Sequence, residues 1–140
     1  MKKQCEITLA SQRRGFHLIT DEVMQKIQEQ GMTLPDCGVL CLFIKHCSCS
    51  LSISENCDPS VRVDLENIFN YIVPENETYY THVLEGSDDM PSHAKSIMAG
   101  SSINIPITNG KLNLGTWQGI YLCEFRNYGG ARKVVATILD

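Results

Sequence analysis

The sequence contains no run of apolar residues that approaches the roughly 18 needed for a membrane-spanning helix. Its first ten residues, MKKQCEITLA, alternate and include Glu6, whereas a secretory signal would need an apolar core of roughly 7–15 residues there. No CxxC pair occurs among the seven cysteines, whose number is odd and whose spacing is irregular. We therefore expect a reduced, cytoplasmic protein without a membrane segment or a disulfide framework.

Positive charge is also scarce. Twelve lysines and arginines face 16 acidic residues, and the net charge of -4 argues against a protein that binds nucleic acid through bulk basicity. A hydrophobic content of 43% and a charged content of 20% are ordinary for a globular protein. The chain has no internal repeat, low-complexity tract or linker, so we expect residues 1–140 to form a single domain.

Local patterns predict the elements of the N-terminal part of the chain. Residues 4–9 alternate as in a half-buried strand, and residues 16–19 form a second short strand. A helix is expected from a cap at Thr20 or Asp21 to about Gln30, with Gly31 as its stop. The run VLCLFI at 39–44 is apolar on both faces, which predicts a central strand that is covered on both sides, and LSIS continues as a shorter extended segment.

Asp58 and Pro59 predict the start of a second helix, because Asp caps first-turn amides and Pro at the first helical position loses no intrahelical bond. This helix should run to about Val73 with an apolar stripe formed by Val61, Leu65, Ile68 and Ile72. Residues 74–91 are mostly loop, and a short helix is expected from Pro91 to Met98 with Gly100 at its end.

The remaining residues predict strands. Segments 103–107 and 112–114 alternate around Asn109-Gly110, a strong hairpin turn signal. Segments 119–125 and 132–138 are expected to form another pair around the loop 127–130. The order of elements predicts an α+β domain: a mostly antiparallel sheet on which two main helices and one short helix pack.

Three of the four histidines lie in polar stretches where sites are often built. His46 follows the apolar run after Lys45, while His82 and His93 flank EGSDDMPS. Imidazole nitrogens with a carboxylate or water suit a divalent metal ion, so these three histidines are candidate ligands. The acidic residues between His82 and His93 either complete such a site or form a solvated loop, and they are Glu85, Asp88 and Asp89.

The segment after His46 contains more serine hydroxyl groups than a connection between a strand and a helix needs. Ser48 and Ser50 are candidate ligands for phosphate oxygens, helped by the following helix N-terminus, or else simple turn residues. Lys95 either meets a phosphate or points to water. Cys47 and Cys49 either hold a soft metal or pack as small residues, and we favour packing.

The segment GTWQGIYLCEFR at 115–126 contains the only tryptophan. Trp117 and Gln118 lie between two glycines, where a ligand can approach the backbone, although Trp117 is more often a core or interface residue. Glu124 alternates onto the face of Ile120 and Leu122, so its carboxylate needs a partner such as Arg126, Arg132 or a histidine.

These segments together resemble the YjbQ family, an uncharacterised protein family that is also labelled secondary thiamine-phosphate synthase. The resemblance spans essentially the whole chain and rests on HCSCSLSISEN with the following DPSVRVDLE, DDMPSHAKS, and GSSINIPITNGKLNLGTWQGIYLCEFR followed by GGARKVV. The family usually has threonines and alanine after its first histidine, where this chain has Cys47, Ser48 and Cys49. It also usually has a histidine-type residue where this chain has Phe125.

The resemblance implies a compact α+β fold in a homotrimer, with the histidine-bearing loops near subunit boundaries. The synthase label implies that a hydroxymethylpyrimidine diphosphate joins a thiazole phosphate with loss of diphosphate. A three-histidine site would favour Zn²⁺, whereas the synthase reaction would favour Mg²⁺.

Two hypotheses follow. In the first, the protein is a metal- or phosphate-binding enzyme in which His46 and Glu124 act in catalysis and the three histidines bind the ion. A phosphorylated metabolite would then contact Ser48, Ser50, Lys95, Trp117, Gln118 and Arg126. In the second, a trimeric module binds a phosphorylated metabolite or a partner protein without turnover.

Overall fold

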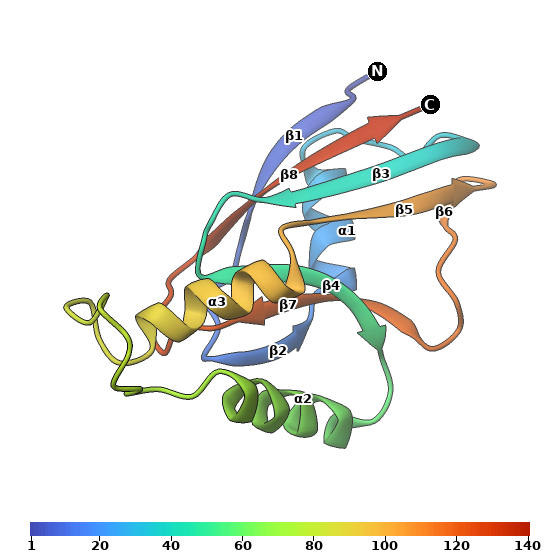
Figure 1. Cartoon of the computed structure of the whole chain (residues 1–140). Coiled ribbons are helices and arrows are strands. Elements are labelled where there is room, and N and C mark those ends of the chain that lie inside the picture. The colour runs from blue at the N-terminus through green and yellow to red at the C-terminus, as the bar shows by residue number, and fades with distance from the viewer.

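The computed structural model describes all 140 residues and consists of two antiparallel sheets and three helices (Figure 1). The larger sheet has five strands in the order β1 (Gln4–Leu9), β8 (Arg132–Leu139), β3 (Cys37–Ile44), β5 (Ser102–Thr108) and β6 (Lys111–Leu112). The smaller sheet has three strands in the order β2 (Gly15–Leu18), β7 (Gln118–Glu124) and β4 (Cys49–Glu55). The helices are α1 (Thr20–Glu29), α2 (Pro59–Ile72) and α3 (Asp89–Ala99). The predicted α+β class is confirmed.

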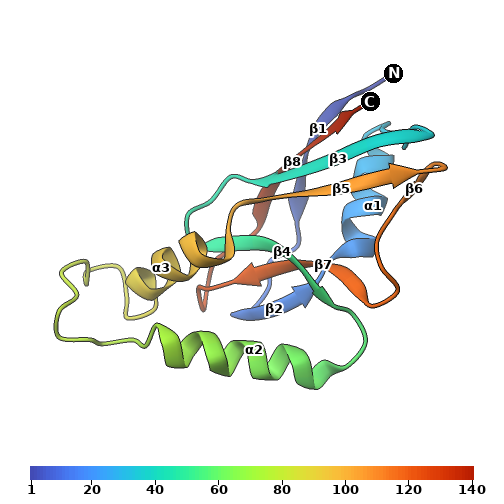
Figure 2. The same cartoon turned by 45° about the vertical axis from the view of Figure 1, so that its right-hand side comes forward.

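The helices cover different parts of the two sheets. In both views α1 lies behind the five-stranded sheet, α2 runs beneath β2, and α3 crosses β4 (Figures 1 and 2). The N- and C-termini lie side by side, because β1 and β8 are neighbouring antiparallel strands and Ile138 donates its N–H to the Lys3 carbonyl over 2.8 Å. α3 has 11 residues against ten in α1, so it is not the short helix that was expected.

The end of α1 follows the prediction, but its start differs from it. Gly31 adopts φ 87°, and the Met32 N–H donates to the Ile27 carbonyl over 3.0 Å, as in a Schellman motif. At the other end Ile19 occupies the cap position without a side-chain hydrogen bond. The hydroxyl of Thr20 instead accepts the Ile120 N–H of β7 over 2.9 Å, so it ties the helix to the sheet rather than capping it.

α2 begins as predicted, with Pro59 in the first turn and the Asp58 side chain accepting the Ser60 N–H over 2.9 Å. The predicted apolar stripe is only partly correct, because no residue of α2 is fully buried. Leu65 packs beside Phe69 against the aromatic side of the three-stranded sheet, while Ile68 and Ile72 stay about half exposed. The helix lies on β2 at the margin of the sheet, so only one side of its stripe finds a partner.

β7 is the strand that is covered on both faces. Its residues Ile120 and Leu122 enter the main core between the two sheets and α1. Tyr121 and Cys123 face the opposite way, into a second cluster with α2 and α3. The double coverage that the apolar run at 39–44 predicted for β3 is wrong for the single chain: Leu40, Leu42 and Ile44 are buried, but Phe43 is 48% exposed because no element covers that face.

The two predicted hairpins have different outcomes. Asn109 and Gly110 have φ values of 54° and 76°, as a type I′ turn requires, and they connect β5 to the two-residue β6. The predicted pairing of 119–125 with 132–138 is wrong. β7 pairs with β2 and β4, whereas β8 pairs with β1 and β3 in the other sheet. The loop after β7 therefore crosses between sheets.

Candidate metal centre

The start of α3 brings two candidate ligands together. The helix begins at Asp89 rather than at Pro91, and the Ser92 N–H donates to the Asp88 carbonyl over 3.0 Å. Pro91 lies within the first turn, where its missing N–H has no intrahelical partner to lose. Asp89 and His93 therefore stand one turn apart on the same side of the helix. A helix that began at Pro91 would have left Asp89 in the preceding loop.

The loop between α2 and α3 supplies the third group. The Asp89 Oδ2 lies 2.7 Å from the His82 Nε2 and 3.1 Å from the His93 Nε2. The ligand atoms of these three residues all lie within 4.8 Å of one another, and the two imidazole centroids are 5.5 Å apart. The Asp89 side chain is 6% exposed, the His93 side chain 28% and the His82 side chain 49%. Asp89 is therefore buried, whereas the cluster is open to solvent at His82.

Hydrogen bonding fixes which nitrogen of His93 carries a proton. The His93 Nδ1 lies 2.8 Å from the carbonyl oxygen of Cys47, which can only accept, so Nδ1 carries the hydrogen. In the neutral imidazole this leaves a lone pair on Nε2, and that lone pair faces the Asp89 carboxylate. Two lone pairs at this separation need a cation between them, either a proton or a metal ion. A backbone carbonyl in this role commonly orients a metal-binding histidine.

The other oxygen of Asp89 is already engaged. Arg126 donates from Nη1 to the Asp89 Oδ1 and from Nε to the Asp88 Oδ2, the latter over 3.0 Å. Burial on its own would raise the pKa of the Asp89 carboxyl, but its hydrogen bond to His82 and the charges of His93 and Arg126 lower that pKa below its ordinary value. Asp89 is therefore an ionised carboxylate near neutral pH, with Oδ2 directed at the histidines.

Asp88 supports this arrangement rather than joining it. Its Oδ2 accepts the Asn127 N–H over 2.9 Å as well as the Arg126 Nε–H. Burial would raise the pKa of Asp88, but these hydrogen bonds lower it. Asp88 and Asp89 are 7% and 4% exposed, so neither belongs to a solvated acidic loop.

Serine hydroxyls attach α3 firmly to the sheet. The Ser50 Oγ donates to the Ser96 carbonyl over 3.1 Å, and the Ser96 Oγ donates to the Cys49 carbonyl over 3.0 Å. These two bonds join β4 to the C-terminal half of α3. Ser50 is fully buried, so its predicted contact with a phosphate is replaced here by a contact with the helix that carries Asp89 and His93.

His46 does not join the other two histidines. Its Nε2 accepts the N–H of Lys133 over 2.8 Å, which leaves this nitrogen without a free lone pair. Burial, together with the positive charges of Arg132, Lys133 and Lys45, lowers the pKa of His46, although Glu124 opposes the shift. The predicted three-histidine set is thus replaced in the structure by two histidines and one carboxylate.

Glu124 finds the partner that its position demanded. Arg132 donates from Nε to Oε1 over 2.8 Å and from Nη2 to Oε2 over 2.5 Å, and the Arg126 N–H adds a longer bond of 3.2 Å. Burial would lower the pKa of Arg132, but the hydrogen bond to Glu124 raises it. Glu124 is 0% exposed and has no hydrogen bond to a histidine, and its pairing with Arg132 joins β7 to β8.

The other predicted ligand-binding residues are dispersed. Ser48 is 9% exposed and its carbonyl oxygen accepts the Phe125 N–H over 3.3 Å. Lys95 is 1% exposed and donates to the Asn70 Oδ1 over 2.6 Å. Burial and the charge of Arg14 lower the pKa of Lys95.

Trp117 and Gln118 lie at the opposite end of β7 from Glu124. At roughly 3.3 Å per residue, the seven residues of this strand span about 20 Å. Trp117 is 64% exposed, and the Gln118 Oε1 accepts the Gly115 N–H over 2.7 Å. Within one chain, neither residue approaches the histidines.

The cysteine pair is separated by burial. Cys47 is exposed and precedes β4, whereas Cys49 is fully buried as its first residue. Burial raises the pKa of the Cys49 thiol to about 12, so it stays protonated and is a poor metal ligand. Cys49 therefore packs as a small buried residue, which is the alternative that the sequence favoured.

Comparison with known proteins agrees with the resemblance seen in the sequence. A family model described as UPF0047 protein YjbQ-like matches residues 5–140. The chain belongs to the YjbQ-like family.

This YjbQ-like protein is 50% identical to the UPF0047 protein YjbQ of Salmonella typhimurium over 96% of each chain. It is 47% identical to the protein of the same name from Escherichia coli O157:H7, again over 96% of each chain. A crystal structure of an uncharacterised conserved protein of the family from Clostridium acetobutylicum shares 36% identity, covers 96% of this chain and 99% of that one, and has a TM-score of 0.81.

Neither Phe125 nor Cys47 contributes its side chain to the cluster. Phe125 faces Phe16 and Phe69, with ring centroids 6.0 and 5.8 Å away, so it belongs to the aromatic core rather than to the cluster. Cys47 contributes only its backbone carbonyl to His93. No helix of this YjbQ-like protein is both long and apolar enough to cross a membrane.

Proposed function

We propose that the protein binds a divalent metal ion through His82, Asp89 and His93. The observation that carries this proposal is the His93 Nε2 facing an ionised carboxylate oxygen while the Cys47 carbonyl accepts from Nδ1, with His82 beside them. Two imidazoles and one carboxylate are a donor set that zinc uses in catalytic sites, and Mg²⁺ prefers oxygen ligands. We therefore propose Zn²⁺ as the ion.

We further propose that the centre acts on a phosphorylated metabolite. A zinc ion with three protein ligands can activate a water molecule or polarise a phosphoryl oxygen in its open position. The chain itself would hold Asp89 through Arg126, orient His93 through the Cys47 carbonyl, and leave the exposed side of His82 open to the substrate. The alternative is a module that binds such a metabolite at this centre without turnover.

The metal content of protein purified without a histidine tag tests the centre. Wild-type protein should carry close to one equivalent of zinc, and His93→Ala and His82→Ala should each lose most of it. His17→Ala is the matched control, because the His17 Nε2 bonds the Arg13 carbonyl over 2.7 Å, outside the cluster.

His46→Ala distinguishes the three-histidine site predicted from the sequence from the His82–Asp89–His93 site. If the second is correct, this variant should retain the metal. Loss of metal in His46→Ala, or less than about 0.1 equivalent in the wild type, would contradict the proposed centre.

The synthase label remains a proposal for the reaction. Thiamine phosphate formed from the two purified precursors measures it directly, with His93→Ala compared against the wild type. A rate that is unchanged in His93→Ala would assign the activity to another site or to a contaminant. Metal binding without any turnover of phosphorylated substrates would favour the non-catalytic module.

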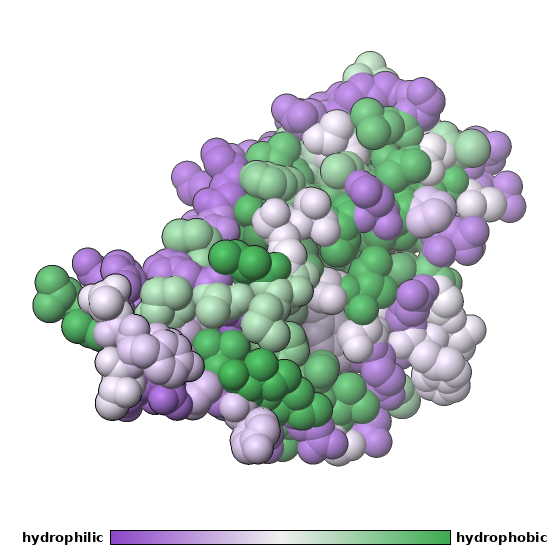
Figure 3. Space-filling view, in the orientation of Figure 1, coloured by the Kyte–Doolittle hydropathy of each residue, from purple (hydrophilic) through white to green (hydrophobic).

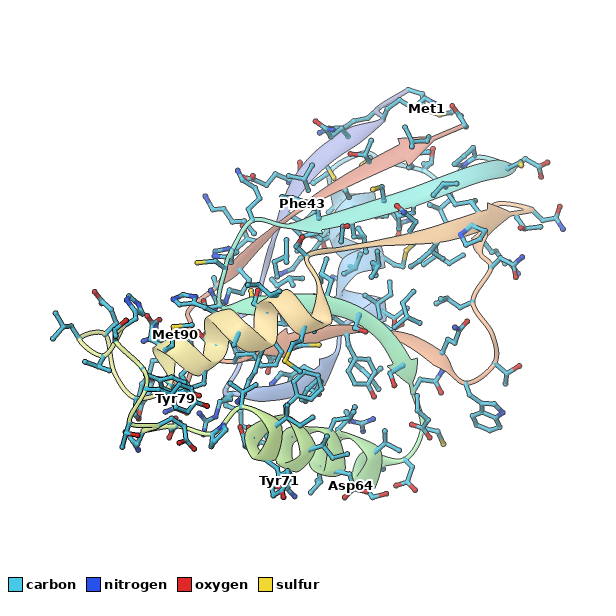
Figure 4. The ribbon with its side chains drawn as sticks, viewed as in Figure 1. Met1, Phe43, Asp64, Tyr71, Tyr79 and Met90 are labelled. Carbon is cyan, nitrogen blue, oxygen red and sulfur yellow. The ribbon has the colours of Figure 1, made fainter.

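We also propose that the protein is a cytoplasmic homotrimer. The outward face of the five-stranded sheet supports assembly, because no element covers it and apolar residues gather over β3 and β5 (Figure 3). Phe43 stands on this face (Figure 4), and it shares the face with Val39, Cys41, Val135 and Leu139. Sedimentation should give three times the monomer mass, and Phe43→Asp should lower it. A monomeric wild type would contradict the assembly.

A further inference from the structure

A second cleft lies between β2 and α2, outside the histidine cluster. Its volume is about 650 Å³, within the range of small-molecule sites, and it contains none of the three proposed metal ligands. Phe16, Leu18 and Val63 give it apolar parts. Its polar lining is mostly basic or neutral and includes Arg13, Arg14, His17, Arg62, Glu66 and Asn67.

The arginines of this cleft differ from those elsewhere in the chain. Of the five arginines in the sequence, Arg126 pairs with Asp88 and Asp89, Arg132 pairs with Glu124, and Arg14 pairs with Glu66 and Glu75. The two arginines without an ion pair, Arg13 and Arg62, both line the cleft.

Arg62 has a further distinguishing feature. Its Nη1 is the one buried side-chain nitrogen or oxygen in the protein that has no hydrogen-bond partner. The Asp58 carboxylate forms no hydrogen bond or ion pair with Arg62, and its Oδ1 accepts the Ser60 N–H. A buried donor without an acceptor is unfavourable, and it is unusual enough in a folded protein to require an explanation.

The charge of the cleft indicates what would satisfy this donor. The only carboxylate that lines the cleft is Glu66, and it is held by Arg14 at 3.4 Å. The cleft is therefore locally positive in a chain whose net charge is -4. Guanidinium groups present paired N–H donors that match phosphate oxygens, and two unpaired guanidinium groups match the several oxygens of a phosphate better than those of one carboxylate.

We propose that this cleft is a second binding site, which takes the phosphate group of a small molecule. The partly buried Arg62 and the exposed Arg13 bind the phosphate. Phe16, Leu18 and Val63 contact the apolar part of the molecule. The site is independent of the proposed metal centre, with which it shares no residue.

Calorimetric titration of the full-length protein with inorganic phosphate and with diphosphate, in EDTA and at constant ionic strength, tests the site. Wild-type protein should bind at least one of the two anions. Arg62→Gln should weaken that binding by at least about tenfold, since hydrogen bonds to charged groups contribute about 1.5–3 kcal/mol. Arg13→Gln should weaken it less.

Lys111→Gln is the matched control, because it removes one positive charge from β6, outside the cleft. It should bind as the wild type does. Equal affinities of Arg62→Gln and Lys111→Gln, or no binding by the wild type, would overturn the proposal.

Thermal unfolding separates binding from a purely structural role of Arg62. Without phosphate, Arg62→Gln should melt at or above the wild-type temperature, because it removes a buried donor that has no partner. With phosphate, the wild type should gain stability and Arg62→Gln should not. A lower melting temperature of Arg62→Gln without phosphate, with an unchanged gain on adding phosphate, would show a structural arginine. The metal content of Arg62→Gln should equal that of the wild type, so failure of either proposal leaves the other standing.

Discussion

Two arginine–carboxylate groups adjoin the end of β7. Both are ion pairs, but they differ in how many carboxylate oxygens the arginine occupies. Glu124 and Arg132 are almost completely buried, and both oxygens of Glu124 are taken by Arg132. Arg126, two residues further along the chain, holds only one oxygen of Asp89 and leaves the other facing two histidines at a partly open surface.

The difference lies in the oxygen that remains available. A carboxylate whose two oxygens are satisfied by one guanidinium in the core can only hold the structure together. A carboxylate that is fixed through one oxygen presents the other in a defined direction, which is what a metal ligand needs. The following four variants, from the largest expected effect on stability to the smallest, test this distinction.

Glu124→Gln should have the largest effect on stability. It leaves the buried Arg132 guanidinium without a counter-charge, which typically costs about 3–5 kcal/mol. Chemical denaturation measures the loss, and the folded fraction should still bind metal. Replacing both partners, as in Glu124→Leu with Arg132→Met, should restore much of the stability. A double variant as unstable as Glu124→Gln would show that the pair has a role beyond mutual neutralisation.

Gly129→Ala should disturb the same buried pair from the outside. A Cβ at this position would lie 2.5 Å from the Glu124 Oε1 and 2.6 Å from the Arg132 Nη2, so the loop or the pair must shift. We expect a loss of about 1–3 kcal/mol, as for other overpacked sites. Gly130→Ala is not a suitable control because of its positive φ of 76°, whereas Ala131→Gly changes the same loop without adding volume.

Asp89→Asn should separate stability from metal binding. The amide oxygen can still accept from Arg126, so we expect a cost of only about 1–2 kcal/mol, together with loss of most of the bound metal. The pKa of Asp89 is lowered in the fold, so its stabilising contribution is complete above the unfolded value near about pH 3.9 and is lost as pH falls through the folded pKa. The difference from the wild type should therefore disappear in acid. A variant that retains its metal would contradict the proposed ligand set.

His46→Gln should have the smallest effect, about 1 kcal/mol or less at pH 8. The pKa of His46 is lowered in the fold, so the unfolded chain takes up the proton first as pH falls below about 6.5. Stability that is present above that pH is therefore lost as pH falls toward the folded pKa. The amide oxygen of Gln accepts the Lys133 N–H at any pH, so denaturation of His46→Gln between pH 8 and 5 should show a smaller pH dependence. An unchanged slope would show that another group titrates in this pH range.

The sequence was most informative where a few neighbouring residues decide the structure. Asp58 with Pro59 starts α2, Gly31 ends α1, and Asn109 with Gly110 forms the turn after β5. The errors lie where distant segments compete. Nothing local distinguishes a β7–β8 hairpin from the observed separation into two sheets, because that choice depends on β2 and β4 pairing with β7.

The site follows the same rule. The sequence singled out His82 and His93, but Asp89 stood between them as one of three acidic residues with no reason to prefer it. The signal that could have found it is its spacing of four from His93, which matters only if the helix already includes both residues. Arg126, which selects the usable oxygen of Asp89, lies 37 residues away in the sequence.

The bonds from the Ser50 hydroxyl to the Ser96 carbonyl and from the Ser96 hydroxyl to the Cys49 carbonyl have a consequence for how the proposed centre would take up an ion. They hold α3 on β4, so Asp89 and His93 are in position before an ion arrives, whereas His82 lies in the irregular segment between α2 and α3. An incoming ion would meet two ligands held by α3 and a third, His82, that lies against Asp89 but is carried by the irregular segment. We therefore expect movement of the His82 segment, rather than of the helix, to set how fast metal is captured and released.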